Sequence, residues 1–268
     1  MTAADFTTRS PRSLGYRFPA EWEPHEATWL AWPRNREDWP GKFRPIPWVY
    51  VEIVRVLSQF ETVRVVVDSP EQRRSAKRKL RRGGARMDRV EFLCARTDRV
   101  WVRDSGPMFV VNDLAQTPEE AVGLVDWRFN AWAKYDDYRQ DDKLPGRIAR
   151  FLERDRDQTW PRWTPRRDVD GASRRIVLEG GAIDANGLGM ILTTEECLLS
   201  PVQQRNPGLD RAGYEHALAE YLGAAHVIWL DRGIVGDDTH GHVDDLARFV
   251  DSSTVAIAQA SRADDENH

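Results

Sequence analysis

The chain has few cysteines, no long apolar run and no strong excess of either charge. Its 268 residues include only two cysteines, Cys94 and Cys197. Two cysteines cannot form a disulfide framework, which excludes the disulfide-rich secreted folds and indicates a reducing, cytoplasmic location. No apolar run approaches the ~18 residues of a membrane span, and the N-terminal residues lack the apolar core of a secretory signal. We therefore expect no membrane partner.

The charge balance gives no overall attraction to nucleic acid. Lys and Arg total 39, Asp and Glu total 43, and the formal net charge is −4. Residues 72–86 form a dense basic run that could be a nucleic-acid patch. The run has no interleaved aromatic residues and few apolar ones, so a solvated helix face is the favoured interpretation. We expect no nucleic-acid partner.

Helix and strand patterns alternate along the chain, which predicts an α/β fold. Apolar Val49, Ile53, Leu57 and Phe60 recur at helical spacing. The expected helices span 46–60, 70–83, 144–155 and 209–221, and the expected strands span 62–68, 90–94, 108–112, 122–127, 225–230, 246–250 and 254–258. Asn186-Gly187 predicts a hairpin. Neither loop-like stretch resembles an interdomain linker, so residues 1–268 are expected to form a single domain. Most of the 11 tryptophans are expected to pack in the core.

Four segments place polar residues beside glycine or aromatic residues. They are EATWLAWP (26–33), WVRDSGP (101–107), LEGG (178–181) and GHVDD (241–245). They follow one another at near-even intervals of 63–75 residues, which suggests repeated supersecondary modules that each bring one loop to a shared centre. Such a centre would collect Asp104, Glu179, His242 and Asp244, with Trp101 nearby. Each residue alone has an ordinary structural explanation, and the nearby Asp237 and Asp238 could cap a turn. Several acids and one histidine together nevertheless predict a cation site.

Two kinds of cation fit these residues. His240, His242 and Asp244 at alternate positions would share one face of a strand and could bind zinc in a metal-dependent hydrolase. A planar guanidinium is the second candidate, because carboxylates can grip its N–H donors bidentately. Its carbon is a poor electrophile, so attack on it needs a thiolate, and a histidine then protonates the leaving nitrogen and activates water.

The motifs resemble those of the agmatine deiminase family, also called the bacterial-type peptidylarginine deiminases. TDRVWVRDSGP, DWRFNAW, LEGGAIDANGLGMILTT and GDDTHGHVDDLARFV carry this resemblance, which extends over about residues 19–260. It implies the pentein fold, an α/β propeller of pseudo-fivefold symmetry, and hydrolysis of agmatine to N-carbamoylputrescine and ammonia without a metal or organic cofactor. It also implies homodimers or larger assemblies.

The resemblance also implies a role for each candidate residue. Asp104 and Asp244 would hold the guanidinium, Glu179 would bind and orient it, His242 would be the general acid and base, and Trp101 would line the pocket. In the family, the nucleophilic cysteine lies in a glycine-rich segment of the last module, and neither cysteine of this chain lies in such a segment. Cys94 ends an apolar run and is expected to be a buried strand residue. We therefore expect about four of five modules, an unclosed and poorly stable ring, and either an inactive deiminase or a non-catalytic guanidino-binding protein.

Overall fold

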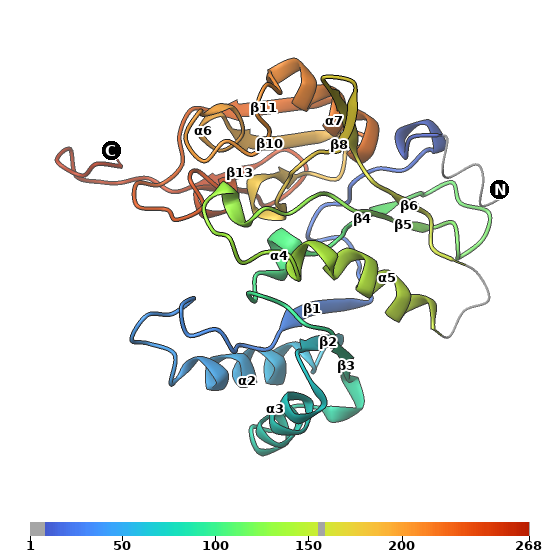
Figure 1. Ribbon diagram of the computed structural model, residues 1–268, viewed down its shortest axis with the longest axis vertical. Coiled ribbons are helices and arrows are strands. Elements are labelled where there is room, and N and C mark those ends of the chain that lie inside the picture. Colours follow the sequence, from blue (N-terminus) through green and yellow to red (C-terminus); the bar gives the residue numbers. More distant parts are fainter. Residues whose placement is uncertain (1–8, 155–158, 268) are drawn as a thin grey trace.

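The computed structural model describes residues 9–154 and 159–267, and its strands form several small sheets (Figure 1). The strands are β1 (Ala27–Ala31), β2 (Thr62–Val67), β3 (Val90–Cys94), β4 (Met108–Val111), β5 (Val122–Val125), β6 (Arg162–Trp163), β7 (Arg166–Val169), β8 (Ala172–Arg175), β9 (Asp184–Ala185), β10 (Met190–Thr194), β11 (His226–Leu230), β12 (Ala247–Phe249) and β13 (Val255–Ile257). The longer helices are α2 (Ile46–Leu57), α3 (Pro70–Arg82), α5 (Leu144–Glu153) and α7 (Arg211–Leu222). This arrangement confirms the α/β class.

The first sheet, β1-β2-β3, is parallel and covered by helices on both faces. Its central strand β2 is rich in β-branched residues, and successive side chains point to opposite faces. Val63 and Val65 pack in a cluster with residues of α2 and α3, while Val66 packs with Leu144 and Ile148 of α5. Figure 1 shows α2 and α3 on the side of this sheet away from the rest of the molecule. The strands expected at 62–68 and 90–94 are confirmed.

Helix α2 forms where the sequence predicts a helix, and the structure shows which of its faces is buried. The buried residues are Val51 and Val54, whereas Val49, Ile53 and Phe60 are exposed. The helix carries apolar residues on both faces, so spacing alone cannot select the face that packs on the sheet.

The middle of the chain builds two further small sheets. Strand β5 pairs antiparallel with β4 and parallel with β6, and β7 and β8 form a separate hairpin. The short helices are η1 (Arg12–Leu14), η2 (Met87–Arg89), α4 (Val102–Ser105), η3 (Ala131–Ala133), η4 (Asp141–Lys143), η5 (Gly180–Ala182), α6 (Glu195–Leu199) and η6 (Val243–Asp245). Three of these, α4, η5 and η6, carry the candidate site residues.

The second half of the chain is organised around β10. This strand pairs antiparallel with β9 and parallel with β11. The hairpin expected at Asn186-Gly187 is confirmed, and Gly187 has the positive φ of +75° that its turn requires. Helix α7 begins after Asp210, whose side chain accepts a hydrogen bond from the Gly213 N–H, and ends at Gly223 in the left-handed conformation.

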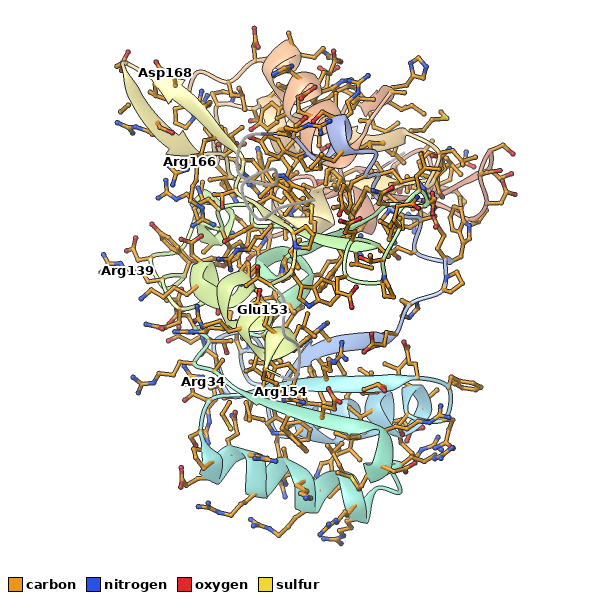
Figure 2. All side chains as sticks on the ribbon, turned by 90° about the vertical axis from the view of Figure 1, so that its right-hand side faces the viewer. Arg34, Arg139, Glu153, Arg154, Arg166 and Asp168 are labelled. Atoms are coloured by element: carbon orange, nitrogen blue, oxygen red, sulfur yellow. The ribbon has the colours of Figure 1, made fainter. Side chains whose placement is uncertain are left out.

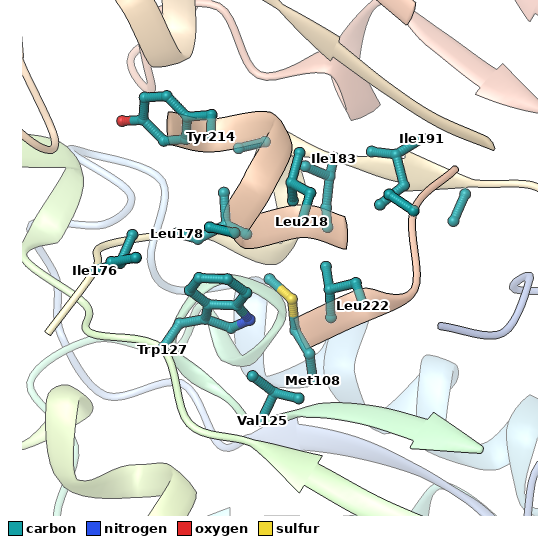
Figure 3. Packing of buried hydrophobic residues seen from close by; sticks show 14 of the residues in the cluster. Met108, Val125, Trp127, Ile176, Leu178, Ile183, Ile191, Tyr214, Leu218 and Leu222 are labelled. Carbon is teal, nitrogen blue, oxygen red and sulfur yellow. The ribbon is translucent and has the colours of Figure 1, made fainter. Parts of the chain in front are cut away.

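The largest hydrophobic cluster joins these two parts of the chain (Figure 3). Met108 and Val125 of the middle sheet lie near Trp127, and Leu218 and Leu222 of α7 cover them. Trp32, Trp127, Trp132 and Trp163 are buried, as expected for core tryptophans, whereas Trp22, Trp48 and Trp101 are exposed. Burial of this apolar surface is the main force that holds the sheets together.

Charged side chains cover the outside of the molecule. In Figure 2, the labelled Arg34, Arg139 and Asp168 lie at its edge. Within the basic run, Ala76 and Leu80 of α3 face the core while most Lys and Arg side chains face solvent, so the interpretation as a solvated helix face is confirmed. In the described part of the chain, no helix combines the length and apolar character needed to cross a membrane.

Candidate active site

Four of the residues singled out from the sequence lie together around one imidazole. Asp104 is in α4, Glu179 directly precedes η5, and His242 and Asp244 flank the start of η6. The Nδ1 atom of His242 is 3.9 Å from Asp104 Oδ1 and 3.7 Å from Asp244 Oδ1, and its Nε2 atom is 3.9 Å from Glu179 Oε2. Glu179 and His242 are buried, at 0% and 2% exposed. The structure thus gathers three carboxylates and an imidazole from segments far apart in sequence.

The two glycines of the LEGG motif allow this close approach. A Cβ atom on Gly181 would overlap the His242 ring, and a Cβ atom on Gly180 would overlap the carbonyl oxygen of Arg103. Glycine is therefore required for steric reasons at both positions. The Gly181 N–H also donates a hydrogen bond of 3.0 Å to Asp104 Oδ1, which links η5 to α4.

His242 is positioned by a turn, not by a strand. Asp237 Oδ2 accepts hydrogen bonds from the backbone N–H groups of Gly241 (2.8 Å) and His242 (3.0 Å). Burial acts to raise the Asp237 pKa, but the hydroxyl and N–H of Thr239 and the N–H groups of Gly241 and His242 outweigh it, so the pKa lies below its ordinary value. Asp237 is thus the turn-capping residue that the sequence suggested as one interpretation.

The strand expected over His240, His242 and Asp244 is wrong. His240 and Gly241 both have positive φ, 63° and 92°, and this turn directs the two histidine rings to different surroundings. His240 Nε2 lies 3.1 Å from Ser200 Oγ, while His242 faces the carboxylates. In the residues described, these three do not form a group with metal-ligand spacing.

Asp104 is already engaged through both carboxylate oxygens. Besides the Gly181 bond to Oδ1, Trp132 Nε1 donates to Oδ2 at 3.2 Å. Burial raises the pKa of Asp104, and nearby Glu179 raises it further, while His242 acts in the opposite direction. A bound cation would therefore stabilise the charged form of this carboxylate.

Glu179 has one paired oxygen and one free oxygen. Arg205 Nε lies 3.2 Å from Glu179 Oε1, and both side chains are fully buried. Glu179 Oε2 and His242 Nε2 are buried and have no hydrogen-bond partner. Buried polar atoms without partners are rare, and such atoms often mark a site for a ligand. Sequence reasoning missed Arg205, because nothing in the local pattern distinguishes it from a surface arginine.

Asp244 lies closer to solvent and forms an ion pair with the guanidinium of Arg103. Its Oδ2 atom is 2.8 Å from Arg103 Nε, and Arg103 also pairs with Glu21. Burial raises the pKa of Asp244, and the charges of Arg103 and His242 partly oppose this effect. The ion pair demonstrates that this carboxylate can accept a guanidinium N–H in its present position.

Trp101 directly precedes α4, and Cys94 ends β3. Trp101 is 40% exposed, and its ring lies 5.8 Å from that of Trp39. Cys94, expected to be a buried strand residue, is exposed at the end of β3, so that expectation is wrong. Cys197, in contrast, is buried in α6, and one ligand atom from each of Glu179, Cys197 and His242 lies within 4.8 Å of the others.

The fold and the site define an α/β protein with a buried acid–imidazole centre. Such a centre can bind a planar cation through its carboxylates and move a proton through its histidine. Comparison with known proteins then defines the family. Residues 17–268 match the family described as Porphyromonas-type peptidyl-arginine deiminase. The chain therefore belongs to this family.

Relatives named agmatine deiminase agree with this assignment. The agmatine deiminase of Pseudomonas aeruginosa (strain LESB58) is 35% identical over 266 residues, which covers 97% of this chain and 65% of that protein. The solved agmatine deiminase of Enterococcus faecalis has a TM-score of 0.79 and 32% identity, over 96% of this chain and 64% of that one.

A substrate-bound cysteine-to-serine variant of the C. jejuni agmatine deiminase has a TM-score of 0.74 and 28% identity, over 94% of this chain and 67% of that one. The chain shares the fold of these enzymes and spans 65% of the length of its curated relatives.

Proposed function

We propose that this chain provides the guanidinium-binding and proton-transfer groups of an agmatine deiminase. The observation that carries the proposal is the buried group of three carboxylates around His242. The relatives' names support agmatine as substrate, and one similar structure is described as holding its substrate. The four segments that hold the site and its surroundings would each belong to a separate module of a pentein propeller, within one deiminase domain.

The proposed roles follow the charges of the site. Asp104, Glu179 and Asp244 would neutralise the guanidinium and accept its N–H donors. His242 would protonate the nitrogen that leaves as ammonia and then deprotonate the water that hydrolyses the covalent intermediate. Asp104 and Asp244 face Nδ1 of the imidazole. Trp101 would line the approach to the site.

The chemistry also needs a thiolate nucleophile, and we propose that neither cysteine of this chain supplies it. Burial raises the pKa of the Cys197 thiol strongly, which leaves it neutral and poorly nucleophilic. Cys94 is exposed at the end of β3 and lies outside the group of Glu179, Cys197 and His242. We therefore expect this chain alone to bind agmatine without hydrolysing it.

Calorimetric titration of the purified chain tests the proposal. Agmatine is expected to bind at least 10-fold more tightly than putrescine, which has no guanidinium. Glu179→Gln should weaken agmatine binding by at least 10-fold, because it removes a buried charge that pairs with the cation. Glu195→Gln is the matched control, since Glu195 is partly exposed in a surface ion pair with Arg211.

Circular dichroism must show that both variants are folded, because Glu179→Gln also alters the partner of Arg205. Asp244→Asn, at a less buried residue, provides a second test and should also weaken agmatine binding. Equal affinities for agmatine and putrescine would contradict guanidinium recognition. Ammonia release from agmatine above that of a His242→Ala variant would contradict the inference that this chain lacks a nucleophile.

A further inference from the structure

The trio of Glu179, Cys197 and His242 has features that guanidinium binding does not require. In the described part of the chain, it is the one group whose carboxylate, thiol and imidazole atoms lie within 4.8 Å of one another. All three residues are buried. Carboxylate oxygen, thiolate sulfur and imidazole nitrogen are the usual protein ligands of zinc.

Two of the three ligand atoms are unpaired. Glu179 Oε2 and His242 Nε2 have no hydrogen-bond partner and lie 3.9 Å apart. Zinc bonds of about 2.0–2.2 Å to a carboxylate oxygen and an imidazole nitrogen place these two atoms about 3.3–3.5 Å apart in a tetrahedral site. Small rotations of the two side chains, which move each ligand atom by a few tenths of an ångström, would bring these two atoms to that spacing.

The surroundings of His242 favour a metal on Nε2. Its other ring nitrogen, Nδ1, faces Asp104 and Asp244 at 3.9 and 3.7 Å. Histidines that bind metals commonly direct their second nitrogen toward a carboxylate, which fixes the ring and makes it a better ligand. The nearby cation Arg205 contacts the other oxygen of Glu179, Oε1, so Oε2 remains available.

We propose that Glu179 Oε2, Cys197 Sγ and His242 Nε2 form a zinc-binding site. On binding, the Cys197 thiol loses its proton to solvent and a Zn–S bond forms, because a coordinating thiol is deprotonated by the metal. The metal would bind His242 through the Nε2 lone pair and Glu179 through Oε2, so neither atom would be available to agmatine. Zinc would therefore compete with agmatine, a consequence that rests on the proposed function, whereas the metal site itself does not.

Metal titration of the purified chain tests the site without any guanidino ligand. Cobalt(II) is a spectroscopic substitute for zinc, and a thiolate ligand gives it a charge-transfer band in the near ultraviolet. Because the chain has only two cysteines, Cys94→Ala leaves Cys197 as the only thiol. This variant is expected to bind one cobalt per chain with the thiolate band, and zinc should displace the cobalt.

The matched variant is Cys197→Ala, which should lose the thiolate band and bind zinc at least 10-fold more weakly in competition with a colorimetric chelator. Its circular dichroism should match that of the unmodified protein. If the buried Cys197→Ala substitution prevents folding, the cobalt spectrum of Cys94→Ala alone tests whether Cys197 binds the metal. Absence of the band in Cys94→Ala, or equal zinc affinity in folded Cys197→Ala, would overturn the proposal.

Discussion

At the scale of single residues, the site depends on groups that are unremarkable in the linear sequence. Gly181 allows the His242 ring to approach, Asp237 fixes the backbone of His242, and Arg205 neutralises one oxygen of Glu179. The charged candidates were predictable from the motifs that contain them. Gly181 belongs to one of these motifs and Asp237 was suggested as a turn cap, but the role of Arg205 was not predictable, because it lies in a contact with a distant part of the chain.

The steric role of Gly181 gives a direct prediction. Gly181→Ala is expected to displace His242 and lower the free energy of unfolding by about 1–3 kcal/mol, because the added methyl group overlaps the ring. Urea denaturation measures this change. Gly146→Ala in α5 is the control, since a Cβ there meets its nearest atom at 3.7 Å. That helical substitution should raise stability by about 0.5–1 kcal/mol. Equal effects of the two substitutions would contradict the steric argument.

At the scale of helices and strands, hydrophobic and turn patterns were sufficient to locate most of the regular structure. Helices α2, α3, α5 and α7 and strands β2, β3, β4, β5 and β11 all form close to their expected positions. The patterns did not identify which face of α2 is buried, since both faces are apolar. They also suggested a strand around His242, where positive φ values at His240 and Gly241 instead produce a turn.

The buried face of α2 can be tested by paired substitutions. Val54 is 0% exposed and Val49 is 49% exposed. Val54→Ala is expected to lower the free energy of unfolding by about 2–3 kcal/mol, from lost apolar burial and the cavity left behind. Val49→Ala should change it by less than about 0.5 kcal/mol. Urea denaturation of both variants measures the difference, and a larger effect at Val49 would contradict the burial of the Val54 face.

Helix η4 contributes a pH-dependent contact. Asp141 accepts backbone hydrogen bonds from Asp98 (2.8 Å) and Arg99 (3.0 Å), yet burial raises its pKa to about 7. An acid whose pKa is higher in the folded state binds more protons when folded, so its contribution to stability falls as the pH rises from about 4 to 7.

We therefore expect Asp141→Asn, which cannot ionise, to lose less unfolding free energy between pH 5 and pH 7.5 than the unmodified chain. Urea denaturation at both pH values provides the comparison. Asp168→Asn, at an exposed position of β7, should leave the pH dependence unchanged. An identical pH dependence in Asp141→Asn and the unmodified chain would show that Asp141 does not carry this effect.

At the scale of the whole molecule, Arg17 connects parts of the chain that are distant in sequence. Its guanidinium pairs with Glu23 and Asp113 and donates to the carbonyl oxygen of Gly187. Arg17→Ala is expected to lower the free energy of unfolding by about 1–3 kcal/mol, because hydrogen bonds to charged groups are lost at three places.

Arg17→Lys should recover less than half of that loss, since an ammonium cannot reproduce the planar fork of donors. Thermal and urea unfolding measure both variants, and Arg12→Ala, at an exposed position, is the control. Full recovery by lysine would indicate that charge alone, without the geometry of the guanidinium, maintains these contacts.

The sequence by itself determined the α/β class, the approximate positions of most elements and the family, because periodicity, turn residues and motifs are local properties of the chain. Only the tertiary structure decided that Cys197 lies beside Glu179 and His242, that Arg205 neutralises one oxygen of Glu179, and that His240 lies beside Ser200 and Glu196. These relations depend on how sheets pack and where the backbone turns, and local sequence patterns do not contain that information.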